Sequence, residues 1–303
     1  MAKKKHNRSF GLTTGEKVFE AVNVAVLILI GLLMLLPFLQ MASKSFSGET
    51  AVLTGKVWFW PVDFQIGTYD YVLKESQFWS SLKISVIITI AGTAGAMVIN
   101  CLTAYPLSKT WLYGRKPLVF LFVFCMLFSG GMVPTYLLMQ TLGFLDSIWV
   151  LIIPGMLGIY NMILLKNFFE DIPEAIEESA QLDGAGSLRI LVSIVLPMSL
   201  PAIATIGLFY AVGYWDNYMT GLLYIKKPKL RPLQYYLYQL VTETQTADNA
   251  GMQKSAEAME DAALNTESIR AATIMLTCVP IMCVYPFLQK YFVQGMRVGS
   301  VKG

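Results

Sequence analysis

The apolar residues of this chain lie in six long blocks that are separated by polar segments. Each block holds about 20 residues or more, and a helix of that length crosses the roughly 30 Å of hydrocarbon in a bilayer. No alternating pattern is strong enough to indicate a β-barrel. We therefore predict an all-α membrane protein with six transmembrane helices and one short helix outside the membrane. The predicted spans cover residues 18–41, 79–106, 117–139, 148–168, 197–224 and 269–292.

The composition narrows the class of protein further. Of 303 residues, 55% are hydrophobic and only 14% are charged, whereas soluble domains carry about 25% charged residues. The net charge of +3 is too small to indicate a nucleic-acid partner. The single histidine, His6, lies in a basic tail, which argues against a histidine-based catalytic site or a zinc site. The cysteines all fall in apolar blocks, where we expect small buried side chains; they are Cys101, Cys125, Cys278 and Cys283.

The distribution of Lys and Arg predicts the orientation. Short loops rich in these residues stay in the cytoplasm, and an even number of spans places both termini on one side. That side carries the larger share of the basic residues, so we expect cytoplasmic tails at 1–17 and 293–303 around a membrane domain at 18–292. The acidic loop at 170–197 is then cytoplasmic, and the long polar segment at 225–268 is an outer loop.

The acidic loop contains the predicted short helix, over residues 172–185. Asp171 followed by Glu174 has the spacing of a capping box, with Asp in place of Ser or Thr. Pro173 is tolerated in a first helical turn. Gly184 is expected to end the helix, since glycine readily takes the left-handed conformation found beyond helix ends.

The faces of this helix leave two interpretations open. Ile172, Ile176 and Ala180 recur every four residues and predict a narrow apolar stripe, opposite a face rich in carboxylates. The helix could lie on lipid headgroups, or it could be a docking site for a cytosolic protein. Its acidity favours docking, because the cytoplasmic leaflet is itself anionic and attracts Lys and Arg.

A fixed spacing of residues adds a family resemblance. Glu178-Ser179-Ala180, then Gly184 after three residues, then Ile194-x-Leu196-Pro197 after nine more, resembles the EAA signature of importer permeases in the ATP-binding-cassette superfamily. Ser179 replaces the first alanine of that signature, a change between two small residues.

Other segments resemble the carbohydrate branch of this superfamily, and within it the second permease subunit of the maltose-type group. Importers of alginate and other oligosaccharides that contain uronic acids are the most similar subgroup. The segments that carry this resemblance are 172–174, 183–185, 291–296 and 299–303.

The resemblance implies a four-part assembly in a bacterial cytoplasmic (inner) membrane. A homologous permease would complete the pathway as a heterodimer, and two cytosolic ATPase subunits would each receive one EAA helix. An extracytoplasmic solute-binding protein would deliver the oligosaccharide. ATP and Mg would be bound by the ATPases, so the chain itself is expected to hold no cofactor and to catalyse no reaction. The implied ATPase-coupling residues are Glu174, Glu178, Ser179, Ala180, Asp183, Gly184 and Ala185.

Polar and aromatic residues at membrane depth are candidates for the substrate path. Intramembrane polar groups are costly and often functional, aromatic rings stack on sugar faces, and Asp or Asn bonds to hydroxyl groups. Alternatively, Trp and Tyr belong to the interfacial belts, and the carboxylate could serve a structural ion pair. The candidates are Tyr160, Asn161, Trp215, Asp216 and Asn217, with Asn100 as a further one.

Two other classes of protein fit the sequence less well than the importer. An ion-driven secondary carrier would need intramembrane carboxylates for coupling, and Asp216 is the one plausible carboxylate at depth. A membrane enzyme would need a nucleophile with a base, and the chain lacks a usable histidine. The nearest approach to an ATP-binding loop, Gly48 to Lys56, has the wrong spacing and no following hydroxyl.

Overall fold

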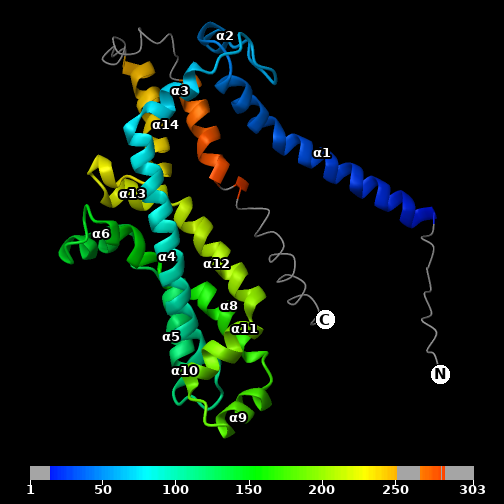
Figure 1. The fold of residues 1–303 in the computed structure, drawn as a ribbon, viewed down its shortest axis with the longest axis vertical. Coiled ribbons are helices and arrows are strands. Elements are labelled where there is room, and N and C mark those ends of the chain that lie inside the picture. The colour runs from blue at the N-terminus through cyan, green and yellow to red at the C-terminus, as the bar shows by residue number, and fades with distance from the viewer. Residues whose placement is uncertain (1–13, 251–266, 281, 284–303) are drawn as a thin grey trace. The chain divides into compact units, whose positions relative to one another are not determined.

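The computed structural model describes residues 14–250, 267–280 and 282–283, all of which lie in helices or in the turns between them (Figure 1). The chain divides into two compact units, which are described separately. One contains Met1–Asp70 with Lys254–Met275, and the other contains Tyr71–Gln253 with Leu276–Gly303. Residues 1–13 of the predicted N-terminal tail, the predicted C-terminal tail and the C-terminal segments of the family resemblance lie outside the described residues, whereas residues 14–17 begin α1.

The first unit begins with the long apolar helix α1 (Thr14–Ser45), which contains the first predicted span. The most apolar 18-residue window of α1 has no buried residue. The short helix α2 (Glu49–Leu53) follows. The ring of Phe46, just after α1, stacks on the ring of Tyr69, with centroids 4.7 Å apart, and so joins the two ends of the segment that contains α2. This unit therefore presents a membrane-length helix whose apolar surface is not covered by the described part of the chain.

The second unit is built on α4 (Ser76–Ser108), a 33-residue helix that contains the second predicted span. It follows α3 (Gly67–Lys74) and packs against α8 (Ile159–Glu170) and α12 (Leu200–Trp215). The buried face of α4 repeats every four residues and consists mainly of small side chains, which allow close helix approach in lipid. Its members include Gly92, Ala96, Asn100, Ala104 and Ser108.

Three of the predicted spans are bent. The third divides into α5 (Arg115–Leu127) and α6 (Met132–Thr141), whose axes differ by 108°. The fourth divides at η1 (Ile153–Gly155), where α7 (Ile148–Ile152) and α8 meet at 44°. Among the described residues, α1 and α4 are the two helices that could each span a membrane alone. If each of the three bent pairs is counted as one span, the total is up to five. The later part of the sixth predicted span lies outside the described residues, and its earlier part is helical over residues 269–280.

The fifth predicted span, 197–224, differs from the structure. The helical run starts earlier, with α10 (Ser187–Ile190), the π-helix η2 (Leu191–Val195) and α11 (Leu196–Met198), and it turns by 87° before α12. The chain leaves α12 after Trp215 and starts a new helix, α13 (Tyr218–Tyr224), because the Asn217 side chain accepts a hydrogen bond from the Thr220 backbone and caps it.

The remaining helices lie toward opposite ends of the second unit (Figure 1). The short α9 (Glu174–Leu182) lies with α10 at one end. Toward the other end lies α14 (Leu233–Ala250), which is reached through the turn η3 (Pro228–Leu230), and α13 lies below α14, part of the way along α4 (Figure 1). The acidic loop is therefore separated by the length of α4 from the segment that follows the fifth span.

Candidate functional site

The C-terminus of α9 agrees with the sequence-based prediction. Gly184 has a φ of +80°, the left-handed conformation. The backbone N–H of Ala185 donates to the carbonyl of Ala180 at 2.9 Å, which closes the last turn. Apart from Gly184 itself and its chain neighbours, no atom lies within 4 Å of a Cβ placed on Gly184. A substitution would therefore disturb the backbone conformation rather than the packing.

The N-terminus of α9 differs from the capping-box prediction, which was wrong in its first residue. Asp171 ends the preceding helix α8, because its backbone N–H donates to the carbonyl of Asn167 at 3.3 Å. Pro173 takes the position before α9, and no side chain caps the helix there. The fixed φ of proline suits this position, since it has no N–H to satisfy.

The buried face of α9 also differs from the predicted stripe. Ile172 and Ala180 pack on the main hydrophobic cluster, but Ile176 is 38% exposed. The residue buried in its place is Glu177, which is only 5% exposed. A carboxylate is tolerated there because both of its oxygens have partners on α4 or just beyond it.

Glu177 is bound by two groups from the end of α4. The Lys109 ammonium forms an ion pair with one carboxylate oxygen, and the Tyr105 hydroxyl donates to the other at 3.3 Å. The same ammonium lies 4.7 Å from the centre of the Tyr105 ring, a cation–π distance. The Lys109 and Glu177 side chains are 11% and 7% exposed. Removing one partner of such a buried pair costs about 3–5 kcal/mol, because the other charge is left uncompensated.

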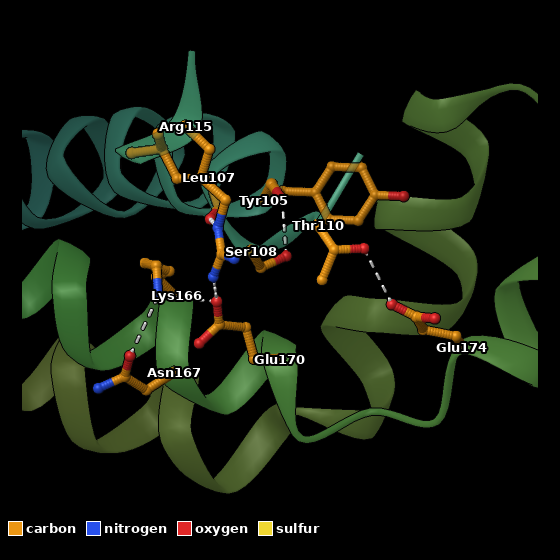
Figure 2. A network of polar contacts seen from close by, with 9 residues as sticks. All are labelled: Tyr105, Leu107, Ser108, Thr110, Arg115, Lys166, Asn167, Glu170 and Glu174. Atoms are coloured by element: carbon orange, nitrogen blue, oxygen red, sulfur yellow. Dashed lines mark hydrogen bonds and ion pairs between the residues drawn. The ribbon is translucent and has the colours of Figure 1, made fainter. Parts of the chain in front are cut away.

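Two further contacts join the basic loop that follows α4, with the start of α5, to the acidic segment (Figure 2). Arg115 donates through Nε to the Leu107 carbonyl at 2.8 Å and pairs through its guanidinium with Glu170, at the end of α8. Lys166 reaches the same carboxylate at 2.8 Å. Thr110 donates to Glu174 at 3.4 Å, on the exposed side of the first turn of α9. Thr110 in the loop after α4 thus contacts α9, and Arg115 at the start of α5 contacts α8.

The outward face of α9 is defined by four of its exposed residues, while Glu174, Ile176 and Gln181 are exposed along its flanks. On the helical wheel the four residues lie opposite Glu177 and Ala180. Leu182 is 90% exposed, so almost none of its apolar side chain is covered by the described part of the chain. This outward face consists of Ala175, Glu178, Ser179 and Leu182. It is small and apolar with one carboxylate, which is a surface suited to close packing against another protein.

The predicted coupling residues are distributed over both faces of the helix and its C-terminal turn. Glu178 and Ser179 lie on the outward face, and Ala180 lies on the packed face. Glu174 is exposed and bound to Thr110. Asp183, Gly184 and Ala185 form the turn that ends α9, where Ala185 packs on the hydrophobic cluster.

The sequence analysis missed Glu177, Tyr105 and Lys109 as members of this site. One signal was available: the predicted spans leave a short loop at 107–116 that is rich in Lys and Arg, on the same side of the membrane as the acidic segment, so opposite charges can meet there. It did not reveal which carboxylate is buried.

The substrate-path candidates lie in two places in the second unit. Tyr160 is 61% exposed and Asn161 is half-buried, both in the first turn of α8. Of the other three, Trp215 is the last residue of α12, and Asp216 and Asn217 lie between α12 and α13. Trp215 is buried, Asp216 accepts a hydrogen bond from Gln234 at 3.5 Å, and Asn217 caps α13.

The break in the fourth span is held by neutral side chains from α4 and α12. Asn100 donates to the Met156 carbonyl at 2.7 Å, Tyr214 donates to the Ile152 carbonyl at 2.8 Å, and Tyr210 accepts from the Gly158 N–H at 2.7 Å. Irregular backbone within a membrane is tolerated where protein groups satisfy it. Asn100 is fully buried in this structural role.

In the turn before α7, a charged side chain also accepts hydrogen bonds from irregular backbone. Asp146 has a φ of +55° and accepts the backbone N–H groups of Lys226 and Lys227 at 2.5 and 3.0 Å. These two hydrogen bonds favour the ionised form and lower the pKa of the Asp146 carboxyl below its usual range.

Comparisons with known proteins identify the family of the chain. The family model described as "Binding-protein-dependent transport system inner membrane component" matches residues 116–298. The chain is 43% identical over 288 residues, 95% of its length and 99% of the relative's, to the polygalacturonan/rhamnogalacturonan transport system permease protein YtcP of Bacillus subtilis (strain 168). It is 40% identical to Protein LplC of the same organism over 96% of the chain and 97% of the relative.

Solved structures give the same family. A chain of a bacterial ABC transporter involved in the import of the acidic polysaccharide alginate matches with a TM-score of 0.85 and 32% identity, over 93% of this chain and 99% of that one. A second alginate transporter chain, from a complex with an alginate pentasaccharide-bound periplasmic protein, shares the fold at a TM-score of 0.55 and 14% identity, over 91% and 95%. The resemblance predicted from the EAA spacing is therefore confirmed: the chain belongs to the family of binding-protein-dependent transport system inner membrane components, the permease subunits of ABC importers.

Proposed function

We propose that this permease subunit carries an acidic oligosaccharide across the cytoplasmic membrane and that α9 is its coupling helix, which docks on a cytosolic ATPase. The observation that carries the proposal is the division of α9 into two faces. Glu177 and Ala180 attach the helix to the membrane domain, while Glu178, Ser179 and Leu182 remain exposed. The EAA spacing begins with Glu178 and Ser179 on this exposed face, continues with Ala180 on the packed face, and includes the left-handed turn at Gly184.

The driving force comes from a partner in this proposal. ATP and Mg are bound by the two ATPase subunits, and closure of the ATPase pair draws the docked helices together. This motion shifts the permeases between inward-facing and outward-facing states, each of which is a different packing of the same helices. The part of this chain is to bind the ATPase and to pass the displacement on.

The other partners follow from the uncovered surfaces and from the relatives. The apolar surface of α1 requires lipid or a second permease, and we propose that a homologous permease completes a heterodimer. A solute-binding protein would dock on the outer side, as the description of the family implies for its members. The excess of Lys and Arg in short loops favours cytoplasmic termini.

The substrate class rests on two relatives. One is named for transport of polygalacturonan and rhamnogalacturonan, and the other belongs to an importer of alginate. Both names describe polymers that contain uronic acids, so we propose an oligosaccharide with carboxylate groups. Trp215, Asp216 and Asn217, with Tyr160 and Asn161, remain the candidate contacts along the path.

Affinity purification from the native host tests this function. The tagged chain, extracted in mild detergent, is expected to bring with it a homologous permease, a cassette ATPase and an extracytoplasmic binding protein, identified by mass spectrometry. The binding protein can then be titrated calorimetrically with galacturonate and alginate oligosaccharides, against maltose-type neutral sugars as the control. A chain that purifies without any ATPase, even after cross-linking, contradicts the importer; preference for neutral sugars contradicts only the acidic substrate.

A further inference from the structure

We propose that Lys109 and Tyr105 are positioning residues that connect the coupling helix directly to α4, so that a displacement of α9 moves the long central span. This inference rests on the proposed function of α9 as a coupling helix. It concerns two residues outside the acidic loop and outside the EAA spacing.

The backbone itself provides only indirect connections between α9 and α4. It attaches α9 to α8 by residues 171–173 and to α10 by residues 183–186. The displacement of a short surface helix could therefore be absorbed in these two turns. A side-chain contact to a third element limits how far α9 can move without that element.

The contact between Glu177 and the end of α4 has the properties that such a connection needs. Both carboxylate oxygens are occupied, by Lys109 and by Tyr105, so the carboxylate has a fixed orientation. Both donors lie within one turn at the C-terminus of α4, and Lys109 directly follows its last helical residue. Because the pair is almost fully buried, water screens it far less than an exposed pair.

The helix that receives the displacement is central to the second unit. α4 packs along both α8 and α12, and Tyr105 and Ala104 belong to the same hydrophobic cluster as residues of those helices. A movement that enters at the end of α4 therefore reaches the break in the fourth span, where Asn100 of α4 binds the Met156 carbonyl.

A second ion pair nearby provides the matched control. Arg115 and Glu170 also join the basic loop to the acidic segment, but Glu170 belongs to α8 rather than to α9. Removing that pair takes away one cation and one carboxylate from the same region and leaves the attachment of α9 intact. It also leaves Lys166, which is 8% exposed, without its carboxylate partner, so this control tests for a loss of stability at least as severely. A loss of stability alone would affect both double variants, whereas loss of the connection should affect only one.

The test uses the purified complex of permeases and ATPases with an environment-sensitive fluorophore at position 90. Ile90 is 66% exposed and lies on α4 about 20 Å from Tyr105 along the helix. The label is attached to an Ile90→Cys variant in which the exposed Cys125 and Cys283 are replaced by Ser. Mg-ATP with vanadate, which traps the closed ATPase, is the probe that drives the change.

The expected result is a spectral shift in the parent complex that is largely lost in Lys109→Ala/Glu177→Ala. This double variant leaves no unpaired buried charge, and Lys109→Arg should retain the shift. Arg115→Ala/Glu170→Ala should also retain it. ATPase recovered with every variant shows that docking is intact, so failure to recover ATPase with the parent chain would count against the proposed function instead. An unchanged shift in Lys109→Ala/Glu177→Ala, or no shift in a parent complex that holds its ATPase, would overturn the connection through Lys109 and Tyr105.

Discussion

Two regions of the second unit join helices in different ways. At the end that holds α9, charged side chains pair with each other, as Lys109 at the end of α4 and Glu177 of α9 do. At the break in the fourth span, neutral side chains bind irregular backbone, and close packing replaces charge. Charge pairs are tolerable at the edge of the membrane, where water can still reach unpaired groups. Within the hydrocarbon, backbone groups must be satisfied by the protein itself. The difference predicts different sensitivities to substitution.

The largest effect is expected at Glu177, in comparison with its neighbour Glu178. Glu177→Ala leaves the Lys109 charge buried without its partner and should destabilise the folded chain by about 3 kcal/mol. Glu178→Ala changes an exposed residue and should alter stability by less than about 0.5 kcal/mol, while weakening the association with the ATPase. Thermal unfolding in detergent measures the first effect, and co-purification of ATPase measures the second. Equal destabilisation by both variants would show that the two faces of α9 are not distinct.

Substitution of two glycines on α4 tests the close packing at the break in the fourth span. A Cβ on Gly92 would lie 2.6–2.8 Å from three atoms of the Tyr214 ring, which is buried and bonded to Ile152. A Cβ on Gly95 would come closest to the terminal methyl of Met156, at 2.5 Å, which can rotate away. Gly92→Ala should therefore cost about 1–3 kcal/mol, and Gly95→Ala much less, by thermal unfolding in detergent. The reverse order would contradict the assignment of Tyr214 as a fixed part of the break.

The turn after α9 distinguishes backbone strain from packing. Gly184 has a φ of +80° and Gly186 has a φ of −73°, and a Cβ placed on either glycine would have no other atom within 4 Å. Gly184→Ala should cost about 1–2 kcal/mol and impair the coupling of ATP hydrolysis to transport, whereas Gly186→Ala should be nearly neutral. Near-normal transport in reconstituted vesicles by the bulkier Gly184→Val would rule out a role for this turn in coupling.

The smallest effect is expected at Asp146, where a charge binds backbone. Because the folded-state pKa of its carboxyl is lowered, the stabilisation is present above the ordinary carboxyl pKa and is lost as the pH falls through the folded-state pKa. Asp146→Asn retains an acceptor oxygen, and Asp146→Ala loses it. Unfolding followed against pH should show the parent chain losing its advantage over Asp146→Asn in that acidic range. An advantage that is constant with pH would contradict a role for the charge.

The sequence predicted some of these features and missed others for physical reasons. Hydropathy located α1 and α4 because a membrane-length apolar run has few alternatives. It did not predict the turn of 87° between α11 and α12, or the end of α12 before Asp216, where the Asn217 side chain caps the next helix locally. Gly184 was predicted as a helix end because its conformation is a local property. The burial of Glu177 was not predicted, because it depends on Lys109, 68 residues away.

Site-specific photocross-linking from α9 tests the central claim most directly. A photoreactive amino acid replaces Leu182, which is 90% exposed on the outward face. The control position is Met219, which is 40% exposed and belongs to α13, a helix well away from the end that holds α9 (Figure 1). If α9 docks on the ATPase, irradiation of native membranes yields a cross-link between position 182 and a cassette ATPase, identified by mass spectrometry, and none from position 219. Cross-links from position 182 to lipid alone, with the ATPase present in the same membranes, would contradict the assignment of α9 as the coupling helix.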